Sequence, residues 1–338
     1  MPRLGTRTTG RPTLNEVAEL SGVSPITASR ALRGVASVDP ALAGRVREAA
    51  LQLGYVANPA ARALASARSS SVVVLIPSLS NQLFIDTLET IHAVMRPRGI
   101  EVLIGNYHYN PAEEEALIRN YLAYQPAGML LTGLARTEAS RRMIAASGVP
   151  CVHMMELSDD PALACVGFSQ ERAGSVATEH LLSRGRRRVA FVAAQLDPRV
   201  LRRLEGYRGA LRAAGVYDPR LEVMCPQPSS IGLGGELFAQ LMAEHPDVDG
   251  AFFCNDDLAH GAIYQAQREG IAVPARVAMV GFNDLPNSAH LVPRLTSIRT
   301  PLAQIGEQAA FKLLARLDGK PELAPGLDLG FELMVRES

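Results

Sequence analysis

Residues 13–32 read TLNEVAELSGVSPITASRAL, a pattern that predicts two short helices joined by a tight break. Thr13 is followed three residues later by Glu16, a capping box that marks the start of the first helix. After a Ser-Gly-Val break, Ser24 can cap the second helix. Pro25 then occupies the first helical position, where its missing N–H costs nothing. Two short helices with this connection predict a helix-turn-helix unit.

The second predicted helix carries apolar and cationic side chains on one surface. If Val23, Thr27 and either Ala31 or Leu32 pack on the other helices, the outward residues are Pro25, Ile26, Ser29, Arg30 and Arg33. An exposed isoleucine beside two arginines suits a DNA major groove, where arginine pairs with guanine and an apolar group meets the thymine methyl. On charge alone, a three-helix cap with incidental arginines remains the alternative.

The N-terminal part of the chain is basic, and the remainder is acidic. A third helix is predicted to begin at Asp39-Pro40 and to end at Gly54. Residues 1–70 contain nine arginines and four acidic residues, whereas the whole chain has 34 basic and 34 acidic residues. A basic end on an otherwise acidic chain indicates a polyanion-binding module attached to another domain.

From residue 71 onward the pattern changes to alternating strands and helices. The run VVVLIP at 72–77 is short, continuous and apolar, which is typical of a strand buried on both faces. Two such alternating series follow each other, one to about residue 154 and one from about 171 to 283. They predict two doubly wound parallel-sheet α/β lobes, with a ligand site in the cleft at the carboxyl ends of the strands.

Several classes of protein are disfavoured by the sequence. It contains no apolar run of about 18 residues, and no apolar segment follows its basic N-terminus, so we expect a cytoplasmic protein without a membrane partner. The four cysteines are scattered without a C-x-x-C pair, so we expect reduced thiols and neither a metal nor a cofactor. No dinucleotide fingerprint, P-loop or nucleophile elbow appears, so we expect no enzyme. A solute-binding protein and a dehydrogenase-like enzyme remain as remote alternatives.

The opening stretch resembles the headpiece of the LacI/GalR family of repressors, including the V-S-x-x-T-x-S-R core of the recognition helix. Residues 53–69, LGYVANPAARALASARS, are similar to that family's hinge helix, and the resemblance continues over essentially the whole chain. It implies a DNA-binding headpiece over 1–56, a hinge helix and linker over 57–70, and an effector-binding and dimerisation domain over 71–338.

The resemblance also implies two lobes of the periplasmic-binding-protein type in the last domain. The implied N-lobe comprises about 71–167 plus 298–323, and the C-lobe about 168–297 plus 324–338. A homodimer on double-stranded operator DNA is implied, because two-fold dimers match pseudopalindromic sites. A tetramer is possible, although no heptad-repeat tail follows the last strand-like segment.

Individual DNA contacts follow from the same resemblance. It implies that base edges are read by Pro25, Ile26 and Arg30. It implies that phosphates are contacted by Thr13, Ser24 and Ser29. Leu64 matches the hinge leucine that enters the minor groove, and Arg33 and Asn58 are further DNA-binding candidates. Because proline offers no side-chain hydrogen bond, recognition at position 25 would use shape or backbone.

The effector candidates lie near the ends of predicted strands. The loop PSLSNQLF contributes Ser78, Asn81, Gln82 and Phe84, with an ordinary helix start as the alternative. The segment DPRVLRRLEGY resembles the family stretch that places an arginine on the effector. Arg203 matches that arginine, and Arg199 lies one turn earlier; such a pair would suit a carboxylate bound bidentately. A solvated arginine face is the alternative.

Further candidates follow three later strands. In the N-D motif, Asn255 is expected to face the ligand and Asp256 to cap the helix. His153 and Glu156 could complete the site, or be a core histidine and a solvated glutamate. Asn283 stands where the family's V-G-[FY]-D-D stretch has an aspartate, which replaces an acceptor-only carboxylate by a neutral amide and favours an anionic ligand.

The sensor domain resembles the gluconate-type branch of the family most, on the motifs PSLSNQLF, VGFSQ and NDDLA and on the pattern at 325–333. We therefore expect a transcription regulator, by resemblance a repressor, whose DNA affinity is set by a sugar acid such as gluconate or 2-ketogluconate. A neutral sugar or another metabolite is the alternative effector. The opposite sign of regulation, in which the ligand strengthens DNA binding, also stays open.

Overall fold

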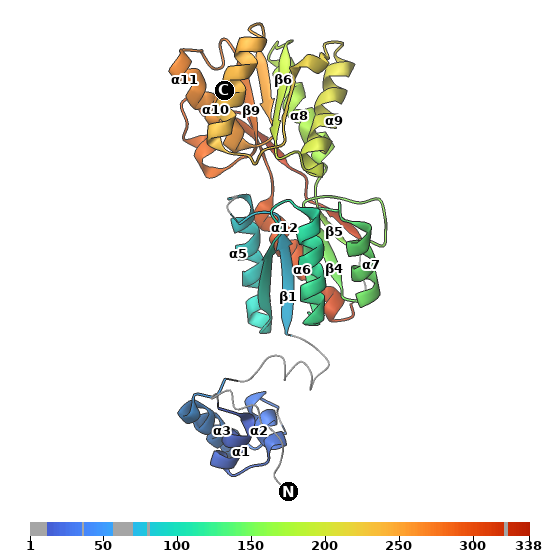
Figure 1. Ribbon diagram of the computed structural model, residues 1–338, viewed down its shortest axis with the longest axis vertical. Coiled ribbons are helices and arrows are strands. Elements are labelled where there is room, and N and C mark those ends of the chain that lie inside the picture. Colours follow the sequence, from blue (N-terminus) through green and yellow to red (C-terminus); the bar gives the residue numbers. More distant parts are fainter. Residues whose placement is uncertain (1–11, 36, 57–69, 80–81, 321–323) are drawn as a thin grey trace. The chain divides into compact units, whose positions relative to one another are not determined.

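The computed structural model describes residues 12–35, 37–56, 70–79, 82–320 and 324–338. The chain forms two compact units, Met1–Ser69 and Ser70–Ser338 (Figure 1). The predicted hinge helix, with Asn58 and Leu64, lies outside the described residues, and so does Asn81.

Three helices make up the described part of the first unit: α1 (Leu14–Ser21), α2 (Pro25–Leu32) and α3 (Pro40–Leu53). The Thr13 hydroxyl accepts from the Glu16 N–H at 3.3 Å, and the Glu16 carboxylate accepts from the Thr13 N–H at 2.6 Å, which confirms the capping box. Ser24 caps α2, as predicted. Gly22 and Gly54 end α1 and α3 in the left-handed conformation.

Small apolar side chains hold the three helices together. Ala28 and Ala31 of α2 are buried against Val17 of α1 and Val46 of α3. Alanine on the inner face of α2 brings the helix axes close, so the longer side chains of α2 remain on its outer face. The core of this unit therefore fixes which residues of α2 are presented to a partner.

The second unit contains two lobes, each built on one sheet. The first sheet has the order β11-β5-β4-β3-β1-β2 and is parallel at every described pairing. Its strands are β1 (Ser71–Ile76), β2 (Glu101–Asn106), β3 (Gly128–Thr132), β4 (Cys151–Met154), β5 (Cys165–Gly167) and β11 (Gly326–Asp328). Its helices are α5 (Leu83–Met95) with η1 (Arg96–Arg98), α6 (Pro111–Ala123), α7 (Glu138–Ser147) and α12 (Leu302–Leu317).

Helices cover both faces of this sheet. On one face, Val72 and Val74 pack in the cluster that includes Ile91 of α5 and Leu313 of α12. On the other face, Val73 packs in a separate cluster under α6 and α7. A strand buried from both sides explains the uninterrupted apolar run at 72–76.

The second sheet has the order β12-β10-β9-β8-β6-β7, with only β12 antiparallel among the described pairings. Its strands are β6 (Val189–Ala194), β7 (Glu222–Cys225), β8 (Gly250–Phe253), β9 (Ala278–Asn283), β10 (Thr296–Arg299) and β12 (Glu332–Met334). Its helices are α8 (Gln170–Ser183), α9 (Pro198–Ala213), α10 (Ile231–Glu244) and α11 (Asp256–Glu269), with η2 (Pro219–Leu221) and η3 (Pro286–Ala289). Helix α8 packs on α9, and α10 on α11.

The chain crosses between the lobes after β5, after β10 and after β11 (Figure 1). The predicted lobe boundaries differ from the structure at two of these places. Strand β10 belongs to the second sheet through Arg299, although residues from about 298 were assigned to the first lobe. Strand β11 pairs with β5 in the first sheet, although 324–338 was assigned to the second lobe. A three-residue strand that fills a sheet edge has too few residues for a periodic pattern.

Two glycines allow α8 and α9 to pack with their backbones in contact. A Cβ atom on Gly206 would lie 1.9 Å from the Glu171 carbonyl oxygen, and one on Gly174 would lie 2.3 Å from the Arg203 carbonyl oxygen. The neighbouring atoms belong to the backbone, so they cannot move aside by a change of side-chain rotamer. The close contact between α8 and α9 therefore fixes the position of Arg203 relative to the start of α8.

We expect Gly206→Ala to lower the free energy of unfolding by about 1–3 kcal/mol, because the added methyl group must push two helices apart. Gly209→Ala on the same helix is the matched control. It has no neighbour within 4 Å and should stabilise by about 0.5–1 kcal/mol through helix propensity. Urea unfolding followed by circular dichroism measures both. Equal changes in the free energy of unfolding for the two substitutions would contradict the close backbone contact between α8 and α9.

Candidate functional site

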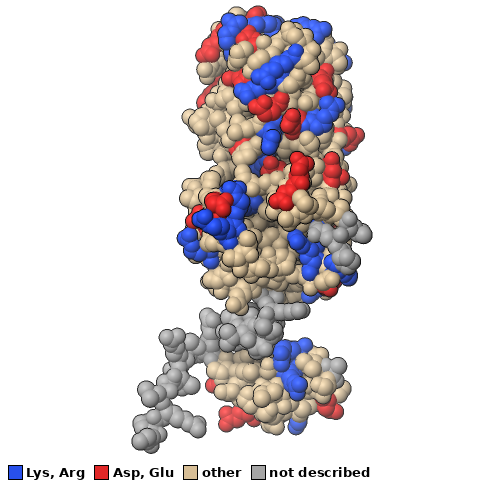
Figure 2. Space-filling model, turned by 90° about the vertical axis from the view of Figure 1, so that its right-hand side faces the viewer, with Lys and Arg blue, Asp and Glu red and all other residues tan. Residues whose placement is uncertain are grey.

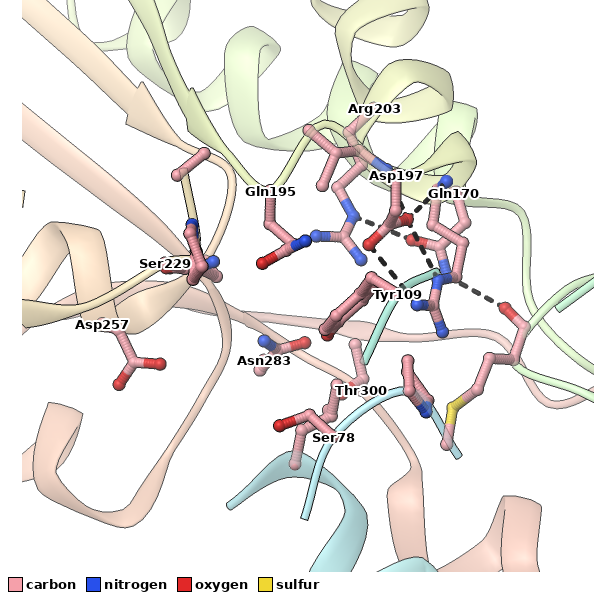
Figure 3. Close-up of a pocket in the computed structure, with 18 of the residues that line it drawn as sticks. Ser78, Tyr109, Gln170, Gln195, Asp197, Arg203, Ser229, Asp257, Asn283 and Thr300 are labelled. Carbon is pink, nitrogen blue, oxygen red and sulfur yellow. Dashed lines mark hydrogen bonds and ion pairs between the residues drawn. The ribbon is translucent and has the colours of Figure 1, made fainter. Parts of the chain in front are cut away.

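A cavity of about 250 Å³ lies where the carboxyl ends of both sheets meet (Figure 3). The first lobe contributes residues that follow β1, β2 and β4, among them Ser78, Tyr109 and Met155. The second lobe contributes residues that follow β6 and β8, and also Asn283, the last residue of β9. The cavity therefore occupies the place at which parallel α/β sheets bind ligands.

Arg203 of α9 lies at the cavity with its guanidinium buried. Its Nε donates to Gln170 Oε1 at 2.8 Å, and its Nη1 donates to the Cys254 carbonyl oxygen at 2.6 Å. The guanidinium carbon lies 3.7 Å from the centroid of the Phe282 ring. Burial lowers the pKa of Arg203 to about 10, so the group still carries its charge near neutral pH.

Gln170 links the buried cation to the first lobe. Its Nε2 donates to the carbonyl oxygen of Met155, which follows β4, at 2.9 Å, while its Oε1 accepts from Arg203. Gln170 is the first residue of α8, directly after the crossing from β5. One amide therefore connects the edges of the two lobes, and its orientation is set by one donor and one acceptor.

Arg199 forms an ion pair at the same edge. Its Nε lies 3.2 Å from Asp197 Oδ1, and Asp197 also caps α9 by accepting from the Arg199 N–H at 2.8 Å. Burial opposes ionisation of Asp197, but the charges of Arg199 and Arg203 and the hydrogen bonds from Arg199 outweigh it and lower the pKa. The charge of Arg199 is thus compensated within the protein.

Residues with left-handed backbone angles gather around the cavity. Outside glycine, positive φ angles among the described residues occur at His108, Tyr109, Gln125, Met155, Gln195, Asn283 and Asp284. Five of these line the cavity, and Asp284 follows one of them. Such conformations cost energy and persist where the surrounding structure imposes them, often at ligand sites. Asn283, with φ 107°, presents its amide to the cavity (Figure 3).

The expected roles of Asn255 and Asp256 are partly reversed in the structure. Asn255 caps α11 by accepting from the Leu258 N–H at 3.1 Å, and it also lines the cavity. Asp256 is fully buried and accepts from Leu285 N–H, Ser288 and Ser297, each at 2.7 Å. The prediction that Asp256 caps the helix was wrong. Its position, one residue inside the helix, turns its carboxylate toward β10 and η3.

The structure brings together five of the effector candidates and separates four others. Those that line the cavity are Ser78, Arg199, Arg203, Asn255 and Asn283. Phe84 packs in the core with only 1% of its surface exposed, because it lies on the inner face of α5. Gln82 is exposed just before α5 and does not line the cavity.

Glu156 and His153 belong to a neighbouring region of the first lobe. Glu156 lines a second cavity of about 310 Å³, where its Oε2 accepts from the Leu134 N–H at 3.0 Å. His153 is buried, and its Nδ1 lies 3.1 Å from Arg136 Nη1. Arg136 is in turn paired with the buried Glu114, with 3.1 Å between Nε and Oε1. The alternative of a core histidine therefore describes His153.

Several cavity residues carry no prediction from the sequence. They are His108, Tyr109, Gln170, Gln195, Asp197, Ser229, Asp257 and Thr300. Most follow a strand by a few residues, and that position was the available signal. A position after a strand does not show which of several consecutive polar side chains points into the cavity. Residues with left-handed backbone angles change the direction of the chain at these places, and the sequence does not mark them.

The outer face of α2 has the predicted composition. The side chain of Ile26 is 71% exposed, and Pro25, Arg30 and Arg33 are exposed as well, whereas Ser29 is half-buried. The hydroxyls of Thr13 and Ser24 take part in helix caps. Figure 2 shows a patch of basic side chains on this unit, while basic and acidic side chains are interspersed on the other unit.

Comparison with known proteins gives two family matches. Residues 13–58 match the bacterial regulatory proteins of the lacI family, and residues 178–338 match a periplasmic binding protein-like domain. Among the described residues, no helix combines the length and the apolar character needed to cross a bilayer.

Three relatives match over most of the chain. The HTH-type transcriptional regulator GntR of Pseudomonas aeruginosa is 67% identical over 333 residues, which cover 98% of this chain and 97% of the relative. The crystal structure of transcription regulator GntR from Chromobacterium violaceum is 49% identical, with a TM-score of 0.77, and covers 79% of this chain and 98% of its own. A transcriptional regulator CelR–cellobiose complex is 30% identical, with a TM-score of 0.71, and covers 97% of this chain and 100% of its own.

The buried His153 predicts a pH dependence of stability. Burial and the adjacent Arg136 lower its pKa from 6.5 to about 4, so the unfolded chain binds the proton more tightly than the folded chain. The contribution of neutral His153 is present above pH 6.5 and is lost as the pH falls toward 4. Between pH 7 and pH 5 we expect the wild type to lose about 2 kcal/mol more of its free energy of unfolding than His153→Gln loses.

Urea unfolding at both pH values measures this difference. His92→Gln, on the exposed surface of α5, controls for the removal of a histidine as such. The same pH dependence in the wild type and in His153→Gln would show that His153 is not held neutral.

Proposed function

Because the chain belongs to the lacI family of bacterial regulatory proteins, we propose that the cavity between its lobes binds a sugar acid such as gluconate or 2-ketogluconate and thereby controls DNA binding by the headpiece. The chain is a transcription regulator with a helix-turn-helix DNA-binding unit, and its relatives are regulators rather than enzymes.

Arg203 supports this ligand class, because the carboxylate that attracts its charge, that of Asp197, already forms an ion pair with Arg199. Both hydrogen-bond acceptors of Arg203 are neutral, and among the described residues no carboxylate forms an ion pair with it. Two buried cations that share one carboxylate leave an excess positive charge, which is costly, and a ligand carboxylate would offset it. The guanidinium fork suits a bidentate carboxylate, whereas the nearby Arg199 is already paired with Asp197.

The remaining polar groups of the cavity suit a hydroxylated chain. Asn255, Asn283, Ser78 and Thr300 present amide and hydroxyl groups, which both donate and accept hydrogen bonds. Asn283, in the position where the family stretch has an aspartate, adds no negative charge next to the cation. A polyhydroxy acid satisfies both the charged and the neutral parts of this lining.

A neutral sugar is the second candidate ligand. It is favoured by the related regulator CelR, which is described in complex with cellobiose. A neutral ligand would leave the positive charge of Arg199 and Arg203 offset by Asp197 alone. Calorimetric titration separates the two candidates, since binding of a neutral sugar but of no aldonic or ketoaldonic acid would refute the sugar-acid proposal.

For DNA, we propose that the exposed face of α2 enters the major groove of a double-stranded operator. Ile26 and Arg30 would contact base edges, and Pro25 would be read by shape, while Thr13, Ser24, Ser29 and Arg33 would lie near phosphates. Asn58 and Leu64, outside the described residues, keep their proposed hinge roles. Two headpieces in a homodimer would match a pseudopalindromic site, and the cytoplasm is the compartment in which the operator is accessible.

Ligand binding would act on DNA binding through linkage. A ligand held by Ser78 on one lobe and Arg203 on the other favours the closed arrangement of the lobes. It can change DNA affinity only by its differential affinity for the two states, about 1–3 kcal/mol in typical cases. Either sign of the effect is compatible with this linkage, and repression released by the acid is the proposed one.

Arg203→Gln should weaken gluconate or 2-ketogluconate binding by about 30-fold or more, because the charged partner of the carboxylate is removed. Arg203→Lys should also weaken it, since an ammonium cannot donate in a fork. Arg202→Gln on the exposed side of the same helix is the control. Isothermal titration calorimetry measures all three variants. Wild-type affinity in Arg203→Gln would exclude Arg203 as the carboxylate partner.

Arg30→Ala should lower operator affinity by about 5- to 150-fold, which corresponds to the loss of one base contact. Non-specific duplex of the same length should be affected much less. Arg47→Ala, exposed on α3, controls for the lost charge and should change both duplexes to a similar extent. Electrophoretic mobility shift at fixed salt measures the two affinities. An equal loss on both duplexes in Arg30→Ala would assign Arg30 to phosphate instead.

A further inference from the structure

Asp257, the second residue of α11, is a cavity carboxylate without a role in the proposed binding of the ligand carboxylate or in DNA binding. It lines the cavity and is half-buried. Among the described residues, none donates a hydrogen bond to its carboxylate or forms an ion pair with it, and no dashed line reaches Asp257 in Figure 3. Asp197, the other acid of the lining, is tied to Arg199 and to the start of α9. The carboxylate oxygens of Asp257 can therefore accept hydrogen bonds from a ligand.

Asp257 and the arginine-bearing edge lie at opposite sides of the cavity. Figure 3 shows Asp257 at one side and Gln170 with Asp197 at the other, with the Asn283 amide between them. The two sides come from different helices, α11 and α9, which follow neighbouring strands. Burial raises the pKa of Asp257, in keeping with a carboxylate whose charge is poorly solvated there. The cavity thus has a cationic side and an anionic side.

We propose that Asp257 is a specificity-determining residue that selects sugar acids with a single carboxylate. It accepts hydrogen bonds from hydroxyl groups at the end of the ligand remote from Arg203, and it rejects acids that carry a carboxylate at both ends. This inference rests on the proposed function, because it presupposes that the ligand carboxylate lies on Arg203.

The chemistry of the carboxylate accounts for both parts of this selection. An ionised aspartate has acceptor sites only, so it is matched by hydroxyl donors, and hydrogen bonds from O–H to a carboxylate are among the stronger ones. A second ligand carboxylate would bring two negative charges together in a partly buried place, where like charges raise the cost of ionisation. Selection then combines an attractive contact with a repulsive one.

The test uses Asp257→Asn in the full-length protein, with gluconate and its six-carbon diacid, glucarate. The two acids differ only in the oxidation of the far carbon. We expect the substitution to weaken gluconate about tenfold, because a charge-assisted hydrogen bond is lost. We expect it to strengthen glucarate by a similar factor, because the repulsion is removed and an amide can donate to the second carboxylate. Isothermal titration calorimetry measures both affinities.

Opposite changes for two ligands in one variant cannot arise from misfolding, which would weaken both. Glu269→Gln, exposed at the other end of α11, is the control and should keep the wild-type ratio of the two affinities. If the wild type binds gluconate and Asp257→Asn leaves the ratio unchanged, the role of Asp257 is overturned while the proposed function stands. If the wild type binds neither acid but binds a neutral sugar, the proposed function fails, and the role of Asp257 fails with it.

Discussion

A buried guanidinium at the carboxyl edge of the second sheet is the interaction on which the arrangement of the cavity depends. Removing the charge of Arg203 from water is costly, and the structure offsets the cost with a glutamine oxygen, a main-chain oxygen and an aromatic face. These three groups belong to the start of α8, the residue after β8 and the end of β9. Satisfying one cation therefore fixes the relative positions of three elements.

The same requirement extends to the first lobe and to the backbone. Gln170 can accept from Arg203 only while its amide nitrogen donates elsewhere, and that acceptor is the carbonyl oxygen of Met155 in the first lobe. Met155 has a left-handed backbone, with φ 74°. The local strain is thus offset by a chain of hydrogen bonds that ends on the cation. A ligand carboxylate on Arg203 would bind at the junction of the lobes, where a small displacement of either lobe changes its contacts.

Much of the fold could be predicted from the sequence, because it depends on local signals. Capping by Thr13 and Ser24 and the apolar run at 72–76 predicted the headpiece and the sheets. The candidate site was only partly predictable. Residues that follow a strand were recognised as a group, but the direction of each side chain depends on single backbone angles. Two features arise from such one-residue differences. Asn255 caps α11 in place of Asp256, and Asp257 lines the cavity. Strand β11 could not be recognised from the sequence, because only its pairing with β5 in the structure identifies it as a strand.

In the proposed mode of regulation, a sugar acid in the cavity changes the DNA affinity of the headpiece. Fluorescence anisotropy of a labelled pseudopalindromic operator duplex, titrated with the full-length protein with and without saturating gluconate or 2-ketogluconate, tests it most directly. We expect the acid to shift the midpoint of DNA binding by about 5- to 150-fold, toward weaker binding. An unchanged midpoint, at acid concentrations that calorimetry shows to fill the cavity, would contradict it.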